Sequence, residues 1–323
     1  MKTPRIDGIH HVTAIASDPQ PNLDFYVRFL GLRLVKRTVN FDDPGTYHFY
    51  YGDETGRPGS ILTFFPWPGA ARGRKGTGQV TLTSFAVPSG SLDYWKERAQ
   101  RFGFRASREA DRFGEPVLAL FDGDDLAIEL IATPRCPADS YPEGADVPSE
   151  FGVRLIHSAT LTLADTARTI SLLTETMGFS ESAREGDRIR FTTGSGGPGS
   201  MLDIVTDPTG KRGLQGAGTV HHIAFRTPDD EHQAGWSQTL MDRGYHVSPV
   251  MDRNYFHSIY YREPGGVLFE IATDPPGFTV DEPAEELGMN LKLPEMYEPM
   301  RERIEAALPA ITVPTTGLLT ESY

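Results

Sequence analysis

Cysteine is almost absent from the sequence, and so are long apolar runs. The single cysteine, Cys136, excludes an internal disulfide and any metal cluster built from several cysteines. No stretch approaches the roughly 20 apolar residues that cross a membrane, and the first residues lack the apolar segment of a signal peptide. These absences predict a cytoplasmic protein.

Positive charge is scarce as well. The 323 residues include 31 lysines and arginines against 44 aspartates and glutamates, which gives a formal net charge of −13. On average, such a surface repels both the phosphates of nucleic acids and the headgroups of anionic membranes. We therefore expect neither nucleic acid nor a membrane as partner. The oligomeric state stays open, and a homo-oligomer is compatible with the sequence.

Glycine and proline are abundant instead, and they recur at the turns of a repeated pattern. The 33 glycines and 25 prolines suit short strands joined by turns rather than long helices. Four segments each begin with a strand-like run, continue into an amphipathic stretch that ends at a glycine, and close on an apolar strand. The opening runs are residues 8–18, 79–89, 153–165 and 219–229, and the closing strands are residues 60–65, 126–131, 200–205 and 267–272. The sequence thus predicts four β-α-β-β-β units.

The four units predict an α+β fold of two domains. A single unit cannot bury its curved sheet alone, so the units are expected to pair. The expected N-terminal domain covers residues 1–133 and the C-terminal domain residues 151–278, with two units in each. Residues 134–150 are rich in proline and acidic residues without periodicity and are the expected linker. In the remaining tail, residues 279–323, a helix is expected over residues 295–308.

Two histidine pairs stand at the same place in the first strands of units one and four: His10–His11 and His221–His222. The closing strand of unit four carries an acidic residue, Glu270. Two imidazoles and one carboxylate on one side of a metal leave positions free for substrate and dioxygen, which suits non-haem Fe(II). Side chains alternate between the faces of a strand, so only one histidine of each pair can bind directly, and the residue pattern leaves open which one. The site requires units one and four to face each other.

Units two and three lack these ligands. The histidine slot holds Leu82 in unit two and Ser158 in unit three, so one metal site per chain is predicted. The acidic slot of these units holds Glu129 and Asp203, which we interpret as structural, and that of unit one holds Thr63.

Unit four adds further candidates on neighbouring strands. Arg253, His257 and Tyr260 should lie beside Glu270, where they could orient a substrate or handle protons, and the role of His257 is left open. The glycine-rich segment 69–78 is not followed by the helix that a phosphate-binding loop requires, so a nucleotide site is excluded. We expect this segment to be a mobile loop near the site entrance.

Together these motifs resemble the vicinal oxygen chelate superfamily, and within it the ring-cleaving dioxygenases that open para-hydroquinones. The resemblance covers nearly the whole chain. Its motifs are GIHHVT (8–13), residues 26–43, GRKGTGQ (73–79), HHIAF (221–225), residues 252–266 and LFEIATDPPGF (268–278). The resemblance implies that Fe(II), or Mn(II) in its place, is bound by His11, His222 and Glu270. It also implies that the catalytic residues around the metal are His10, Thr13, His221, Arg253 and Tyr260.

The expected function follows from this resemblance: O2 and a small aromatic substrate are the implied partners, and cleavage of a hydroquinone ring is the implied reaction. In the related catechol-opening extradiol branch the first ligand lies in unit three, where this chain has Ser158, so His11 in unit one favours hydroquinones. A metal-dependent isomerase or lyase of the glyoxalase type is an alternative, although it would need an extra carboxylate where unit one has Thr63. A binding module without catalysis would need no metal triad.

Overall fold

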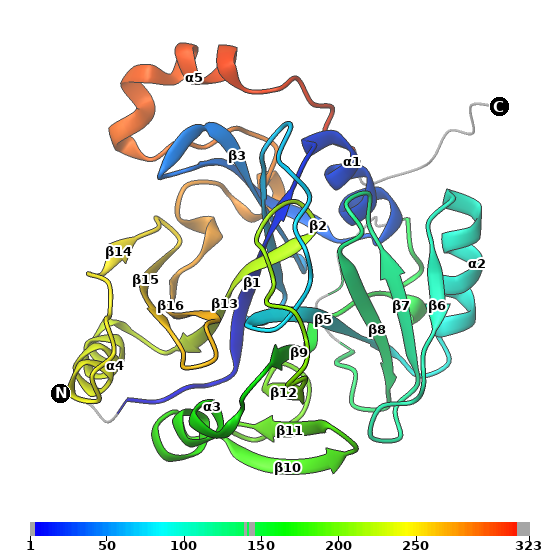
Figure 1. Cartoon of the computed structure of the whole chain (residues 1–323). Helices are drawn as coiled ribbons and strands as arrows, with labels where there is room; N and C mark the ends of the chain where they lie inside the picture. Colours follow the sequence, from blue (N-terminus) through cyan, green and yellow to red (C-terminus); the bar gives the residue numbers. More distant parts are fainter. Residues whose placement is uncertain (1–3, 139–140, 142–145, 315–323) are drawn as a thin grey trace.

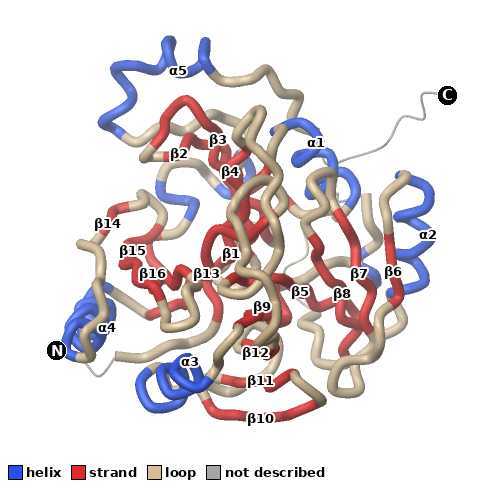
Figure 2. Tube along the Cα trace, in the orientation of Figure 1, coloured by secondary structure: helices blue, strands red, loops and turns tan. Residues whose placement is uncertain are grey.

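The computed structural model describes residues 4–138, 141 and 146–314, which form two curved eight-stranded sheets with helices on the outside (Figure 1, Figure 2). The expected linker over residues 134–150 lies only partly within the described residues, and residues 315–323 of the tail lie outside them. The α+β architecture of four β-α-β-β-β units is confirmed.

The first sheet combines unit one with unit four. In spatial order its strands are β14 (Met251–Asp252), β15 (Phe256–Arg262), β16 (Leu268–Pro276), β13 (Thr219–Thr227), β1 (Ile9–Ala16), β4 (Ile61–Pro66), β3 (Asp43–Gly52) and β2 (Arg33–Asn40). β1 and β13 run antiparallel in the middle and join the two units. β1 is buried along its whole length, so its polar side chains need partners inside the protein.

The second sheet combines unit two with unit three. In spatial order its strands are β10 (Ser180–Glu185), β11 (Arg188–Thr192), β12 (Met201–Thr206), β9 (Ile156–Leu163), β5 (Gln79–Pro88), β8 (Ala127–Thr133), β7 (Val117–Phe121) and β6 (Ala106–Arg108). Here β5 and β9 make the antiparallel junction in the middle, so the second sheet repeats the plan of the first.

The units therefore pair differently from the expectation of one two-unit domain over residues 1–133 and another over residues 151–278. Each sheet takes one unit from either half of the chain. The physical reason is the long β1–β13 junction, which occupies the free edge of unit one and leaves β5 of unit two to pair with β9 of unit three. This arrangement places the two histidine pairs on adjacent strands.

The helices are short and lie outside the sheets (Figure 2). They are α1 (Pro19–Leu23) with a π-helical continuation (Asp24–Phe29), α2 (Leu92–Phe102), α3 (Ala167–Ser171) with a π-helical continuation (Leu172–Thr176), α4 (Asp230–Asp242) and α5 (Arg301–Ala307), with 3-10 turns at Ser149–Phe151, Phe278–Val280 and Ala284–Glu286. α2 packs on β6 and β7, and α4 packs on β15 and β16. Within the described ranges no helix is long and apolar enough to cross a membrane. The cytoplasmic location stays a prediction.

The tail folds back over unit one, where α5 packs on β3 (Figure 1). The helix expected over residues 295–308 is confirmed in its second half, whereas Glu295–Met300 form a 3-10 helix. Pro299 lies in that first half, and a proline lacks the N–H that continues an α-helix.

A buried ion cluster holds the start of the tail. Lys36 on β2 is fully buried, and its Nζ lies 2.5 Å from a carboxylate oxygen of Asp281 and 2.5 Å from one of Glu282. Nearby, the ring of Phe278 packs against that of Tyr50 with 5.1 Å between centroids. The start of the tail therefore packs against Tyr50 of β3, a residue that lines the cavity described below.

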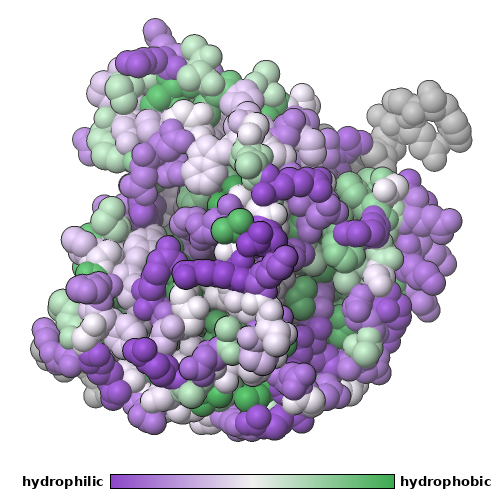
Figure 3. All heavy atoms as spheres, viewed as in Figure 1, coloured by the Kyte–Doolittle hydropathy of each residue, from purple (hydrophilic) through white to green (hydrophobic). Residues whose placement is uncertain are grey.

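Two equivalent loops cross between the sheets, the β4–β5 loop with the glycine-rich segment 69–78 and the β12–β13 loop (Figure 1). Arg74 and Leu214 exchange two backbone hydrogen bonds. A Cβ at Gly76 would lie 2.1 Å from the carbonyl oxygen of Lys211, so only glycine permits this approach. The segment expected to be a mobile loop is instead bonded to its counterpart. The same area is strongly hydrophilic in Figure 3.

Candidate active site

Three strands of the first sheet bring two histidines and a carboxylate to one point. His11 on β1, His222 on β13 and Glu270 on β16 are all buried, and their ligand atoms lie within 4.8 Å of one another. His222 Nε2 lies 2.9 Å from Glu270 Oε2, His11 Nε2 lies 3.4 Å from the same oxygen, and the two Nε2 atoms are 3.3 Å apart. The structure thus brings together the three residues expected to bind a metal.

The donor atoms of this cluster fit a divalent cation. Glu270 Oε1 accepts a hydrogen bond from Ser258 Oγ at 2.5 Å, whereas the buried Oε2 has no hydrogen-bond partner among the residues that the structure describes, despite its two short contacts with imidazole nitrogens. A buried carboxylate oxygen without a partner is destabilising, and a cation between it and two imidazoles would remove that penalty. Two imidazoles and one carboxylate suit Fe(II) and Mn(II).

In each histidine pair, the histidine that does not face the cluster, His10 or His221, contacts Nδ1 of the ligand histidine next to it. We call His10 and His221 the outer histidines. His10 Nδ1 lies 2.9 Å from His11 Nδ1, and His221 Nδ1 lies 2.8 Å from His222 Nδ1. A neutral imidazole carries one proton, so a ligand histidine that donates from Nδ1 keeps a lone pair on Nε2 for a metal. The β1–β13 pairing is irregular at both His10 and His221, each of which is an extra residue in its strand. These irregularities bring together rings that strict alternation would separate.

Burial and close contacts shift the pKa values of several groups at the site. Burial, and then His222, lowers the pKa of His221 to about 3, and burial also holds the pKa of His222 below its usual value. Burial opposes ionisation of Glu270, but the neighbouring His11 and His222 outweigh it and hold the pKa of this carboxyl well below its usual range. An ionised carboxylate is the form that binds a divalent metal.

The strand register supports the internal alignment of the four units. In every unit the opening strand runs parallel to the closing strand, and the residue two positions after the histidine slot faces the acidic slot. The facing pairs are Thr13–Thr63, Ser84–Glu129, Thr160–Asp203 and Ala224–Glu270. Thr63 therefore occupies in unit one the place that Glu270 occupies in unit four.

In the second sheet, arginine side chains lie beside the acidic slots, where the first sheet has the two histidines of the cluster. Arg190 donates to both carboxylate oxygens of Asp203, at 2.8 and 3.0 Å, and Arg188 adds a bond at 3.1 Å. Glu129 accepts two hydrogen bonds from Arg112. Guanidinium groups thus neutralise these buried carboxylates, which supports the interpretation of Glu129 and Asp203 as structural.

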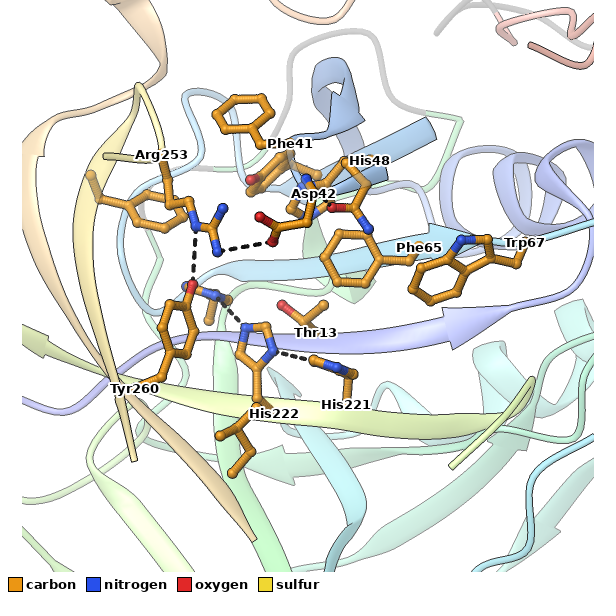
Figure 4. Close-up of a pocket in the computed structure, with 15 residues that line it drawn as sticks. Thr13, Phe41, Asp42, His48, Phe65, Trp67, His221, His222, Arg253 and Tyr260 are labelled. Atoms are coloured by element: carbon orange, nitrogen blue, oxygen red, sulfur yellow. Dashed lines mark hydrogen bonds and ion pairs between the residues drawn. The ribbon is translucent and has the colours of Figure 1, made fainter. Parts of the chain in front are cut away.

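A cavity of about 340 Å³ opens beside the metal-binding cluster (Figure 4). This volume lies at the small end of ligand pockets and suits a single aromatic ring. Aromatic side chains make up much of its wall: Phe41, Tyr50, Phe65, Trp67 and Phe256. Four of the residues expected to be catalytic also line it, namely Thr13, His221, Arg253 and Tyr260. The fifth, His10, lies behind His11 with its ring 4.9 Å from that of Phe256.

Arg253 and Tyr260 form a polar wall of the cavity (Figure 4). Arg253 donates from Nε to the hydroxyl of Tyr260 and from a terminal nitrogen to Asp42 of unit one, both at 3.3 Å. Burial raises the pKa of Tyr260, so the phenol keeps its proton. Burial opposes the charge of Arg253, but Tyr260 and Asp42 outweigh it and hold the pKa of the guanidinium above its usual value. Tyr260 pairs with Glu270 in the register, so this wall adjoins the cluster.

Sequence reasoning did not single out several residues at the site, and two of them form hydrogen bonds that matter here. Ser258, which bonds Glu270, lies two positions before Tyr260, and strand alternation could have identified it. His48 on β3 lines the cavity, and no motif of unit one pointed to it.

His257, whose role the sequence left open, lies outside this cavity. Its Nδ1 is 2.6 Å from a carboxylate oxygen of Asp230 on α4, in a separate surface hollow. Among the residues of unit four that the sequence singled out, Arg253 and Tyr260 face the cluster, and His257 does not.

Comparison with known proteins agrees with this geometry. The family model described as "Glyoxalase/Bleomycin resistance protein/Dioxygenase superfamily" matches residues 8–130 and 155–271. "Putative ring-cleaving dioxygenase MhqO" of Bacillus subtilis (strain 168) is 47% identical over 301 residues, which cover 93% of this chain and 95% of that protein. "Chlorohydroquinone/hydroquinone 1,2-dioxygenase" of Sphingobium indicum is 34% identical over 307 residues, again 93% and 95% of the two chains.

A solved structure agrees as well. A crystal structure of a Bacillus subtilis protein is 45% identical and superimposes with a TM-score of 0.91, over 97% of this chain and 99% of that one. The relatives match most of the chain, and the residues matched by the family model include all three positions of the cluster. The chain therefore belongs to the glyoxalase/bleomycin resistance protein/dioxygenase superfamily, among relatives named as ring-cleaving dioxygenases.

Proposed function

We propose that this protein is an Fe(II)-dependent dioxygenase that uses O2 to cleave the aromatic ring of hydroquinone or a substituted hydroquinone. The observation that carries the proposal is the buried His11–His222–Glu270 cluster beside a largely aromatic cavity of single-ring size. The names of the relatives support the same reaction class.

The proposed metal would be held by His11 Nε2, His222 Nε2 and Glu270 Oε2, the three atoms that converge in the cluster. Fe(II), when bound there, would supply the redox chemistry that allows a phenolate and dioxygen to react. Mn(II) suits the same donors. The outer histidines of both pairs keep the Nε2 lone pairs of the ligands directed at this position.

The protein's own part is to bind and orient the ring. Phe65, Trp67 and Phe256 offer apolar faces that exclude water from it. The guanidinium of Arg253 and the protonated hydroxyl of Tyr260 lie beside the cluster, where they stabilise negative charge on a substrate oxygen. Their mutual hydrogen bond fixes both donors before the substrate enters.

His221 is the outer histidine that can hydrogen-bond to the substrate, because it lines the cavity and His10 does not. When His221 Nδ1 accepts from His222, its proton resides on Nε2. Thr13 adds a hydroxyl on the same wall as His11. These groups give the cavity hydrogen-bond donors close to where an oxygen would be bound.

Two alternatives receive less support from the geometry. A glyoxalase-type isomerase would need a carboxylate where Thr63 lies, and Thr63 is engaged in hydrogen bonds with Thr13 and His48. A catechol-opening enzyme would draw its first ligand from the place of Ser158, which lies in the second sheet beside the arginine-filled position.

The test is oxygen uptake by anaerobically Fe(II)-loaded protein with hydroquinone, methylhydroquinone and catechol in parallel, and with His222→Ala as the inactive variant. We expect uptake with a hydroquinone, little with catechol, and none in the variant. Turnover of a glyoxalase-type substrate without oxygen would favour the isomerase. Absence of uptake with every ring, at one bound iron per chain, would overturn the proposal.

A further inference from the structure

We propose that His48 recognises the ring hydroxyl remote from the metal, and so selects substrates with two para hydroxyls over simple phenols. This inference rests on the proposed function, because it names the residue that hydrogen-bonds to the second hydroxyl of the substrate in the same cavity. His48 lines the cavity and belongs to unit one, whereas Arg253 and Tyr260 belong to unit four. Figure 4 shows His48 and Tyr260 on different sides of the cavity.

The internal symmetry of the first sheet gives His48 a defined place. Tyr50 pairs with Thr63 on the adjacent strand, as Tyr260 pairs with Glu270. His48 is therefore the counterpart of Ser258, two positions earlier on the equivalent strand. Ser258 bonds the carboxylate in unit four, and His48 bonds Thr63, the residue in the equivalent slot of unit one. The part of the cavity where a fourth metal ligand could lie thus holds a hydrogen-bond chain instead.

The direction of this chain determines what His48 presents to the cavity. Thr63 Oγ1 donates its only proton to Thr13 Oγ1 at 2.9 Å. His48 Nε2, which lies 2.9 Å from Thr63 Oγ1, must therefore be the donor in that bond. In a neutral imidazole the other nitrogen, Nδ1, is then an acceptor. Burial, followed by repulsion from His11, holds the pKa of His48 well below its usual value, which is consistent with the neutral ring.

His48 is also held in place before any ligand binds. Its ring lies 4.0 Å from that of Tyr50 and 4.4 Å from that of Phe65, measured between centroids. Within the described part of the chain, no hydrogen bond uses its Nδ1. A fixed acceptor without a protein partner beside an aromatic cavity suits a hydroxyl group of a ligand.

The chemistry of hydroquinone matches this acceptor. Its two hydroxyls lie at opposite ends of the ring, so when one is at the metal the other points to a distant wall, whereas the hydroxyls of catechol are adjacent. A buried polar group that expects a hydroxyl disfavours an analogue that lacks one, because the group is then left unpaired. His48 Nδ1 therefore distinguishes hydroquinone from phenol at the end of the ring that does not react.

The test compares anaerobic binding of hydroquinone and phenol to the Fe(II)-loaded protein. Both ligands offer one hydroxyl to the metal, so the ratio of their Kd values isolates the remote hydroxyl. We expect wild type to bind hydroquinone about tenfold tighter. His48→Phe keeps a ring between Tyr50 and Phe65 and should bring this ratio close to one, with metal content unchanged.

A matched pair of variants locates the effect at Nδ1. Asparagine places its amide near the position of Nδ1, and glutamine places its amide near that of Nε2. His48→Asn should therefore retain part of the hydroquinone preference, and His48→Gln should lose it, which gives a result even where His48→Phe fails to fold.

The failures of the two proposals are distinguishable. An unchanged Kd ratio in His48→Phe and His48→Gln would overturn this inference, while oxygen uptake with hydroquinone by wild type would leave the proposed function standing. Absence of uptake by metal-loaded wild type would overturn the proposed function, and the binding ratio would still decide whether His48 reads the hydroxyl.

Discussion

Replacing His221 by phenylalanine should weaken metal binding without removing a ligand. His222 would lose the partner that lies 2.8 Å from its Nδ1, while its Nε2 and the other two ligands would remain. Loss of the outer partner of a metal-bound histidine typically weakens affinity about 10- to 100-fold. That change corresponds to roughly 1.4 to 2.7 kcal/mol, the range of a buried hydrogen bond that also selects a tautomer.

The assay is anaerobic competition for Fe(II) between the protein and a chromogenic chelator at neutral pH. His221→Asn retains an acceptor for the proton of His222 Nδ1 and should lose less affinity than His221→Phe. His257→Phe, at a histidine of the same unit outside the cavity, is the matched control and should bind metal like wild type. An affinity of His221→Phe within about threefold of wild type would show that the outer histidine does not support the ligand.

Three further substitutions test the polar wall of the cavity, the ion cluster at the start of the C-terminal tail, and an ion pair in the second sheet. Tyr260→Phe removes the hydroxyl donor beside the cluster and should lower kcat for hydroquinone about 100-fold in oxygen uptake, with a smaller change in KM. Lys36→Met leaves the buried Glu282 without its cation and should reduce the free energy of unfolding in urea by about 3 to 5 kcal/mol. Burial opposes ionisation of Glu115 in the second sheet, but His157 outweighs burial and lowers the pKa of this carboxyl from 4.5 to about 2. The Glu115 carboxylate therefore stabilises the fold above pH 4.5, and this contribution is lost as the pH falls toward 2. Urea unfolding of Glu115→Gln should accordingly depend less on pH than that of wild type in this window.

Each of these expectations has a contradicting result. A loss of kcat below about threefold in Tyr260→Phe would mean that the hydroxyl does not act on the reacting oxygen. A change below about 1 kcal/mol in Lys36→Met would mean that the carboxylates find other partners. If the free energies of unfolding of wild type and Glu115→Gln fell in parallel between pH 5 and pH 3, the Glu115 carboxylate would not contribute to the loss of stability in acid.

The repeat and the candidate ligands were readable from the sequence because both depend on local patterns. The histidine pairs stand at equivalent strand positions, and glycines such as Gly103, with φ at 74° after α2, end the helices of the units. The strand register places Thr63 opposite Thr13 as the unit alignment requires. The residues of one cluster could thus be identified before any long-range contact was known.

The proposed ligands required units one and four to face each other, but the pairing of the units within the sheets could not be predicted from the strand pattern. Every unit offers a similar β edge, so local pattern does not distinguish pairing of neighbours from pairing of the first unit with the last. The crossing loops were misjudged for a related reason, since Gly76 indicates a close approach but not what approaches it. His48 was missed because its contact with Thr63 joins two strands whose register the sequence does not specify.

The pairing of the first unit with the last gives the molecule a nested order. Units two and three are consecutive in the chain and can assemble their sheet while synthesis continues, but β1, which pairs with β4 on one side, has no partner on its other edge until β13 has been made. About two hundred residues are synthesised between His11 and His222, and Glu270 follows later still. This long separation in sequence makes the last step of folding slow relative to the formation of local contacts. A nascent chain released before unit four would leave one edge of the buried strand β1 unpaired and would lack His222 and Glu270, so a metal bound at this cluster would report that synthesis has passed the last strand of unit four.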